Sequence, residues 1–195
     1  MMAKLYFRYG AMNCGKTTAL LQVAYNYEEK GKKVIIIKSI IDTKGDDSIV
    51  SRLGVSRKVD VLLGIDEKIM DLKIDLSKIS CILVDEVHFL SETQIDELWI
   101  ISKTKNIPVI CYGIRTDFQS VAFPGSKRLL EIADSLDELI TICNCGKRAR
   151  FQSRKVNNKY VFEGEKVVID GSRDDVVYEP LCGECYIKNV FSLKK

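Results

Sequence analysis

The stretch LYFRYGAMNCGKT at residues 5–17 decides the fold of this chain. Residues 5–9 are rich in aromatic side chains and predict a β-strand. The motif G-x-x-x-x-G-K-[ST] is matched at every fixed position by the next eight residues, which are Gly10, Ala11, Met12, Asn13, Cys14, Gly15, Lys16 and Thr17. Apolar residues then recur at helical spacing over residues 17–30. A strand, a glycine-bearing turn and a helix in this order predict a loop whose backbone N–H groups bind a polyphosphate.

A second strand carries the acidic groups that chemistry at such a loop requires. Residues 82–84 are apolar and lead directly into Asp85 and Glu86. We expect Lys16 to contact the β- and γ-phosphates, and the Thr17 hydroxyl to bind Mg²⁺, with Asp85 holding the same ion through water. Glu86 should point to the opposite side of the pleat, where it can act on an incoming hydroxyl or water as a general base.

Several side chains near this strand also have a plainer interpretation. Glu86 is otherwise an exposed acid beside a metal ligand. His88, the only histidine, either touches the nucleotide and orders the site or is a polar loop residue. Phe118 and Phe123 either belong to the local core or form a platform on which a base stacks. The residues alone leave these alternatives open, as they do the choice between water and a hydroxyl as phosphate acceptor.

Solid apolar runs, unlike alternating ones, predict strands that are covered on both faces. Such runs occupy residues 34–37, 81–84 and 109–112. They are typical of a parallel sheet flanked by helices. The sequence therefore predicts an α/β fold with a mostly parallel sheet.

Local signals predict the remaining elements of this domain. Ser91 and Gln94 have the spacing of a capping box, which opens a helix that runs to about residue 105. One face of this helix should be formed by Ile95, Leu98 and Trp99. A further helix is expected over residues 126–134 and a strand over residues 139–142.

Four of the seven cysteines form two close pairs near the end of the chain. Cys143 and Cys145 precede an irregular segment that Cys182 and Cys185 follow. Four thiolates suit a tetrahedral structural Zn²⁺, which we favour over unmetallated thiols; a catalytic zinc would need an open position. The segment has too few apolar residues for a core of its own, and a metal would explain how it folds. The two asparagines at residues 157–158 predict a hairpin within it.

Length and charge restrict the possible functions. A chain of 195 residues suits one α/β domain with a small appendage. A net charge of +3 gives no support to a nucleic-acid partner. The N-terminus lacks the pattern of a signal peptide, and no window approaches the ~18 apolar residues of a membrane helix. We therefore expect a cytoplasmic protein with no membrane partner.

Five segments, in order along the chain, carry a resemblance to a known family. They are YGAMNCGKT at 9–17, VDE at 84–86, CYGIRTDF at 111–118, TICNCG at 141–146 and GEKVVI at 164–169. Together they resemble the type II, zinc-containing thymidine kinases of the bacterial type. The resemblance extends from about residue 4 to residue 186.

The resemblance implies a RecA-like P-loop core over residues 1–140 that binds ATP. A small zinc-anchored lasso domain over residues 141–191 should cover the nucleoside, and residues 192–195 should form a flexible tail. The implied reaction transfers the γ-phosphate of Mg-ATP to the 5′-hydroxyl of thymidine, with deoxyuridine as a second acceptor, to give dTMP and ADP in pyrimidine salvage. Inhibition by dTTP and a homotetramer are implied as well.

The resemblance also assigns roles to individual residues. Glu86 matches the catalytic base. ATP and phosphates should be bound by the loop at residues 10–17 together with Asp85, His88 and Arg154. The nucleoside should be bound by Ile114, Phe118, Phe123, Val168, Ile169, Asp170 and Tyr178. The zinc ligands should be Cys143, Cys145, Cys182 and Cys185.

Three positions depart from the family pattern. His88 stands where Gln is common, and Lys44 stands where Arg is usual, in a loop one residue shorter. Asp170 replaces a glycine, which would adopt positive φ angles more freely. None of these departures removes a catalytic group.

The alternative function is a nucleic-acid-stimulated P-loop ATPase with a zinc knuckle. Such a protein needs a basic groove and stacking residues along a single strand. One feature of the sequence favours it, the basic cluster Lys147, Arg148, Arg150, Arg154 and Lys155. A non-catalytic zinc-ribbon adaptor is a third candidate, but it leaves the phosphate loop unexplained.

Overall fold

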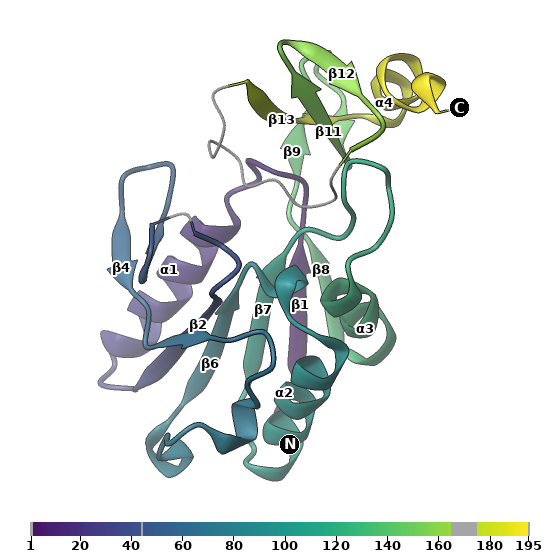
Figure 1. Cartoon of the computed structure of the whole chain (residues 1–195). Helices are drawn as coiled ribbons and strands as arrows, with labels where there is room; N and C mark the ends of the chain where they lie inside the picture. The colour runs from purple at the N-terminus through teal and green to yellow at the C-terminus, as the bar shows by residue number, and fades with distance from the viewer. Residues whose placement is uncertain (1, 44, 165–174, 195) are drawn as a thin grey trace.

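A six-stranded parallel sheet forms the centre of the protein in the computed structural model, which describes residues 2–43, 45–164 and 175–194 (Figure 1). Every strand pair in this sheet is parallel. The strands are, in spatial order, β5 (Val61–Leu63), β2 (Val34–Ser39), β6 (Cys81–Asp85), β7 (Val109–Gly113), β1 (Leu5–Tyr9) and β8 (Ser135–Glu138). The predicted parallel sheet is therefore confirmed.

Helices cover both faces of this sheet. The first face packs against α1 (Lys16–Glu28), and the second against α2 (Glu92–Thr104) and α3 (Pro124–Ile132). Short 3₁₀ turns η1 (Ile69–Asp71), η2 (Leu76–Lys78) and η3 (Val87–Phe89) connect the strands. The strands between the helices are buried on both faces, which explains their solid apolar sequences.

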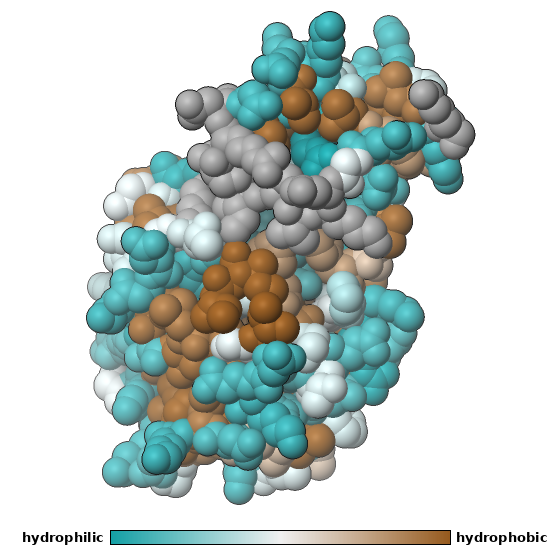
Figure 2. Space-filling model, in the orientation of Figure 1, coloured by the Kyte–Doolittle hydropathy of each residue, from teal (hydrophilic) through white to brown (hydrophobic). Residues whose placement is uncertain are grey.

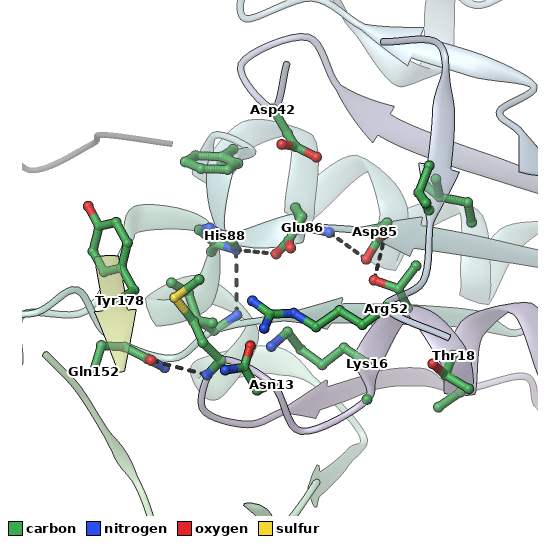
Figure 3. A pocket seen from close by; sticks show the side chains of 18 of the residues that line it. Asn13, Lys16, Thr18, Asp42, Arg52, Asp85, Glu86, His88, Gln152 and Tyr178 are labelled. Atoms are coloured by element: carbon green, nitrogen blue, oxygen red, sulfur yellow. Dashed lines mark hydrogen bonds and ion pairs between the residues drawn. The ribbon is translucent and has the colours of Figure 1, made fainter. Parts of the chain in front are cut away.

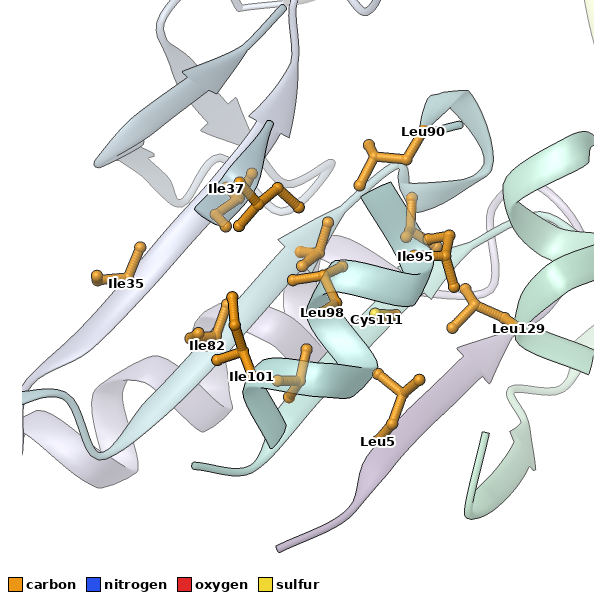
Figure 4. Close-up of a cluster of buried hydrophobic side chains, with 14 of the residues drawn as sticks. Leu5, Ile35, Ile37, Ile82, Leu90, Ile95, Leu98, Ile101, Cys111 and Leu129 are labelled. Carbon is orange, nitrogen blue, oxygen red and sulfur yellow. The ribbon is translucent and has the colours of Figure 1, made fainter. Parts of the chain in front are cut away.

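The capping box predicted at the start of α2 is present. The Ser91 hydroxyl accepts the Gln94 N–H at 3.2 Å, and the Gln94 side chain accepts the Ser91 N–H at 3.0 Å. Ile95 and Leu98 are fully buried beneath the helix (Figure 4). The placement of Trp99 on the buried face is wrong, since 40 % of this residue is exposed. The helix turns its buried stripe toward position 101 instead, and position 99 lies on its flank.

The strand predicted over residues 139–142 is wrong in position. The edge strand β8 ends at Glu138, and β9 (Thr141–Ile142) pairs outside the central sheet with β10 (Arg148–Ala149). The sequence of β8, Ser-Leu-Asp-Glu, has no apolar run because an edge strand is covered on fewer sides. A hairpin of β3 (Ser48–Val50) and β4 (Ser56–Lys58) lies beside the sheet.

A second, smaller unit follows the central sheet along the chain. It contains β11 (Phe151–Val156), β12 (Lys159–Val161), β13 (Val176–Leu181), α4 (Gly183–Asn189) and the 3₁₀ turn η4 (Phe191–Leu193). The predicted hairpin is confirmed between β11 and β12. Both turn residues, Asn157 and Asn158, have the positive φ angles of a type I′ turn.

This unit has a small hydrophobic cluster, so the prediction that the segment has too few apolar residues for a core of its own is wrong. Tyr186 and Val190 of its C-terminal part are buried with Leu181, and the Phe151 ring stacks on Tyr186 at 4.8 Å. Phe151 comes from a distant strand, and Leu181, Tyr186 and Val190 are spaced among other residues, so no apolar run reveals the cluster. The domain boundary at residue 140 remains a prediction. In the described residues, no helix has the length and apolarity needed to cross a membrane.

Candidate active site

A cavity of about 670 Å³ opens at the carboxyl ends of β1, β6 and β7 (Figure 3). Ligands of open α/β sheets bind at this edge, because the strand ends and helix N-termini meet there. One end of the cavity is the phosphate loop, and the other is the loop after β7. Gln152 of β11 and Tyr178 of β13 line it from the smaller unit. The cavity is large enough for a nucleotide-sized ligand.

The phosphate loop has the backbone that the motif predicts. Gly15 has a φ of 80° and immediately precedes α1, so the loop leads directly into the helix N-terminus, where N–H groups can bind an anion. A Cβ on Gly10 would lie 2.5 Å from Leu139 O, so only glycine fits at this position. Lys16 is buried, and its Nζ donates to Ala11 O at 3.2 Å. The loop residues that line the cavity are Met12, Asn13, Gly15, Lys16 and Thr17, whereas Gly10, Ala11 and Cys14 do not line it.

Thr17 and Asp85 meet where the motif places a magnesium ion. The Thr17 hydroxyl lies 3.4 Å from Oδ2 of Asp85, whose side chain is almost fully buried. Burial, and next the negative charge of Glu86, raise the pKa of Asp85 to about 7, while the Glu86 N–H and Lys16 lower it in part. A buried carboxylate beside a hydroxyl supplies the oxygen ligands that Mg²⁺ prefers. The residues present therefore fit this ion.

Glu86 reaches the cavity by a different route from the one predicted. It does not alternate across the pleat, because β6 ends at Asp85 and Glu86 has left-handed backbone angles, φ 44° and ψ 42°. Its N–H donates to Oδ1 of Asp85 at 3.1 Å. The left-handed turn directs the carboxylate into the cavity, where 29 % of the side chain remains exposed.

His88 is buried and lines the same cavity, which favours a role in the site over that of a plain polar loop residue. Its Nδ1 lies 3.4 Å from Oε2 of Glu86 and 3.5 Å from the backbone nitrogen of Ile114. Burial, and next the positive charge of Lys16, lower the pKa of His88 to about 3. The ring is therefore neutral at physiological pH.

Aromatic side chains form the end of the cavity that faces away from the phosphate loop. Ile114, Phe118, Phe123 and Tyr178 all line it, together with Phe89. Phe118 is almost fully buried, and its carbonyl accepts the Tyr186 hydroxyl at 2.7 Å. An apolar pocket with few polar groups suits a planar base.

Arg154 lies behind this aromatic end. Its guanidinium is 3.8 Å from the centroid of the Phe118 ring, and its Nη2 donates to Glu163 O at 2.9 Å. It does not line the cavity. Its predicted role near the phosphates therefore remains a prediction, and its described contacts support the aromatic wall instead. The predicted residues Val168, Ile169 and Asp170, and the departure at Lys44, lie outside the described residues.

The sequence interpretation missed several residues of the site. Oδ1 of Asp117 accepts the N–H groups of Gln119 and Val121, both at 2.9 Å, and so shapes the loop between the two phenylalanines. Turn chemistry typical of aspartate could have indicated this residue. Oε1 of Gln152 accepts the Met12 N–H at 3.1 Å. No sequence signal indicated that contact, because 140 residues separate its partners.

The four cysteines predicted as zinc ligands come together. The sulfur atoms of Cys143, Cys145, Cys182 and Cys185 all lie within 4.8 Å of one another. Burial raises the pKa of Cys143, but backbone N–H groups and neighbouring thiols outweigh it and lower the pKa to about 7. Four sulfur atoms gathered this closely suit a structural zinc ion. The cluster joins the start of the smaller unit to the beginning of α4.

Comparison with known proteins identifies the family. A family model described as "Thymidine kinase" matches residues 3–186. The chain belongs to the thymidine kinase family. Proteins named thymidine kinase from Francisella tularensis and Chromobacterium violaceum are 40 % and 43 % identical to it, over 97 % and 95 % of this chain and 100 % and 98 % of theirs. Another, from Colwellia psychrerythraea, is 46 % identical over 93 % of this chain and 95 % of its own.

Membership of the thymidine kinase family confirms the resemblance and the expected enzyme class. None of these matches favours the ATPase alternative. The basic cluster that suggested it is largely paired with acids: Lys147 with Glu184, Arg148 and Arg150 with Glu138, and Lys155 with Glu179. These pairs do not form the basic groove that a single strand would require.

Proposed function

We propose that this protein transfers the γ-phosphate of Mg-ATP to the 5′-hydroxyl of thymidine, giving dTMP and ADP in pyrimidine salvage, with deoxyuridine as a second acceptor. One observation carries the proposal. A phosphate loop and the carboxylate of Glu86 line a single cavity whose far end is aromatic. A phosphate donor and a planar nucleoside therefore have separate places on either side of a general base.

The donor end binds the triphosphate. The loop N–H groups and the N-terminus of α1 attract its oxygens, and Lys16 exchanges its contact with Ala11 O for the β- and γ-phosphates. Thr17, and Asp85 through water, would hold Mg²⁺, which neutralises charge on the transferring group.

The acceptor end orients the nucleoside. Phe118, Phe123 and Ile114 would hold the base, and Tyr178 would lie near the sugar. The 5′-hydroxyl would then lie between the base-binding wall and the phosphates. The carboxylate of Glu86 would then take the hydroxyl proton as the oxygen attacks the γ-phosphate.

The remaining features of the proposal follow from the family. The four cysteines would bind one structural Zn²⁺, and Val168, Ile169 and Asp170 would contact the base edge. A dTTP molecule would inhibit by occupying the acceptor end, and the enzyme would act in the cytoplasm as a homotetramer. Exposed Ile40, Leu62 and Ile65 near the β5 edge support self-association, and Figure 2 shows hydrophobic side chains gathered in a stripe on this face.

A panel of nucleosides assayed for phosphorylated product tests the function. With Mg²⁺ and ATP, we expect phosphorylated thymidine and ADP release that depends on thymidine. The same assay with single-stranded DNA in place of nucleoside should release no additional ADP. If DNA alone stimulated ADP release and every deoxynucleoside stayed unphosphorylated, the proposed function would be wrong.

A further inference from the structure

One atom of the His88 ring faces two groups with opposite requirements. Nδ1 is 3.4 Å from Oε2 of Glu86 and 3.5 Å from the Ile114 nitrogen. Figure 3 marks the contact between His88 and Glu86 with a dashed line. The carboxylate requires a proton on Nδ1, whereas the Ile114 N–H requires a lone pair there. Because a neutral ring carries either the proton or the lone pair at Nδ1, it serves one neighbour at a time.

Packing fixes the direction in which Nδ1 points. Only 4 % of His88 is exposed, and its ring centroid lies 4.1 Å from that of Phe89 and 4.7 Å from that of Phe123. Gly113 leaves room on the other side, since a Cβ there would lie 3.3 Å from Nδ1. A ring held on these sides keeps Nδ1 directed at Glu86 and Ile114.

Charge decides between the two neighbours. A hydrogen bond to an ionised acceptor is about twice as strong as a neutral one. The Glu86 contact at 3.4 Å and the Ile114 contact at 3.5 Å are both long for hydrogen bonds, so distance does not separate them and the charge of the carboxylate does. The low pKa of His88 supports a neutral ring that donates one proton. The carboxylate therefore favours the tautomer with the proton on Nδ1.

We propose that His88 is a positioning residue for Glu86: its Nδ1–H holds the carboxylate over the cavity. The Ile114 N–H then stays available to a nucleoside bound at the aromatic end of the cavity. His88 has this task only if Glu86 is the base of the proposed kinase reaction. The Glu86 side chain is partly exposed and would otherwise sample several rotamers. Holding it affects the chemical step more than the binding of either substrate.

Two substitutions separate positioning from packing. His88→Phe keeps the ring and its contacts with Phe123 but removes Nδ1, whereas His88→Asn places an amide where Nδ1 lies. We expect the Phe variant to lose roughly tenfold or more in kcat, with KM for ATP and for thymidine changed by less than about threefold. The Asn variant should exceed the Phe variant in kcat by about tenfold, because its amide can serve both Glu86 and Ile114.

Thermal unfolding and ATP binding show whether each variant is folded. If the Phe variant kept kcat within about twofold of the original enzyme, His88 would not position the base. If the Asn variant were no more active than the Phe variant, the ring would act through packing alone, which also overturns the proposal. Failure of the original enzyme to phosphorylate any nucleoside would instead refute the proposed function.

A spectroscopic measurement tests the same contact without activity. Because the chain has a single histidine, ¹⁵N-histidine labelling of tag-free protein gives one imidazole signal set in the NMR spectrum. We expect the proton on Nδ1 in the original protein and on Nε2 in Glu86→Ala, where only the Ile114 N–H still faces Nδ1. The same tautomer in both proteins would show that Glu86 does not engage the ring and would overturn the proposal.

Discussion

At the residue scale, Glu86 combines the proposed chemistry with an uncommon backbone conformation. Its left-handed angles turn the chain out of β6 and aim the carboxylate at the cavity. We predict that Glu86→Gln binds ATP normally but loses about 10²-fold or more in phosphate transfer, because the amide cannot take a proton. Steady-state kinetics with thymidine, alongside a nucleotide-binding measurement, checks this. Near-normal turnover would remove Glu86 from the mechanism.

The same position should show a trade between activity and stability. A residue with a Cβ costs about 1–2 kcal/mol in the left-handed conformation, and glycine removes this cost. Glycine also loses more backbone entropy on folding, which offsets part of the gain in stability. Glu86→Gly should therefore raise the free energy of unfolding by up to about 1 kcal/mol while transfer is lost. Urea unfolding of the two variants compares them directly. If Glu86→Gly were less stable than Glu86→Gln, the backbone would not be strained there.

At the element scale, the contact between α3 and η3 positions His88. A Cβ on Gly125 would lie 2.6 Å from Val87 O and 2.7 Å from Leu90 O, so the helix and the turn touch through backbone atoms. Gly125→Ala should lower the free energy of unfolding by about 1–3 kcal/mol and should reduce kcat, since η3 must move. Chemical unfolding and kinetics measure the two effects.

Gly64 offers a matched control for this substitution. A Cβ there would come no closer than 3.4 Å to Glu67, which is ordinary contact. Gly64→Ala should therefore change the free energy of unfolding by less than about 0.5 kcal/mol. Equal losses in both alanine variants would argue against a specific close approach of α3 to η3.

A second contact at this scale joins α4 to the aromatic end of the cavity. Tyr186 follows the last cysteine directly, and its hydroxyl donates to Phe118 O. Removing a hydrogen bond of this kind costs about 1 kcal/mol, or roughly fivefold in binding. Tyr186→Phe should raise KM for thymidine by that factor, with KM for ATP unchanged. An equal rise in both constants would show a general disturbance of the fold instead.

At the scale of the whole molecule, the cysteine cluster should hold the smaller unit against the central sheet. We predict that purified protein contains zinc, and that chelation or Cys143→Ser removes it, lowers the melting temperature and abolishes nucleoside binding. Cys111→Ser, at a buried thiol of β7, should leave the zinc content unchanged. Metal analysis and calorimetry follow these changes. Full nucleoside binding by the zinc-free protein would contradict the prediction.

The sequence predicts the parts of this molecule that local patterns encode. The phosphate loop, the capping box at Ser91 and the turn at residues 157–158 each depend on a few neighbouring residues, and the structure confirms them. Contacts between distant residues leave no such pattern. The bond from Met12 to Gln152 and the left-handed turn at Glu86 both depend on tertiary packing, so sequence alone could not give them.

The order of the strands has a consequence for synthesis on the ribosome. Among the described strands, the first, β1, pairs only with β7 and β8, whose residues are translated after more than half of the chain. A nascent chain that ends before residue 109 therefore has no partner for β1 and no seated phosphate loop. ATP can then protect the growing polypeptide from proteases only once residues 109–113 and 135–138 have left the exit tunnel.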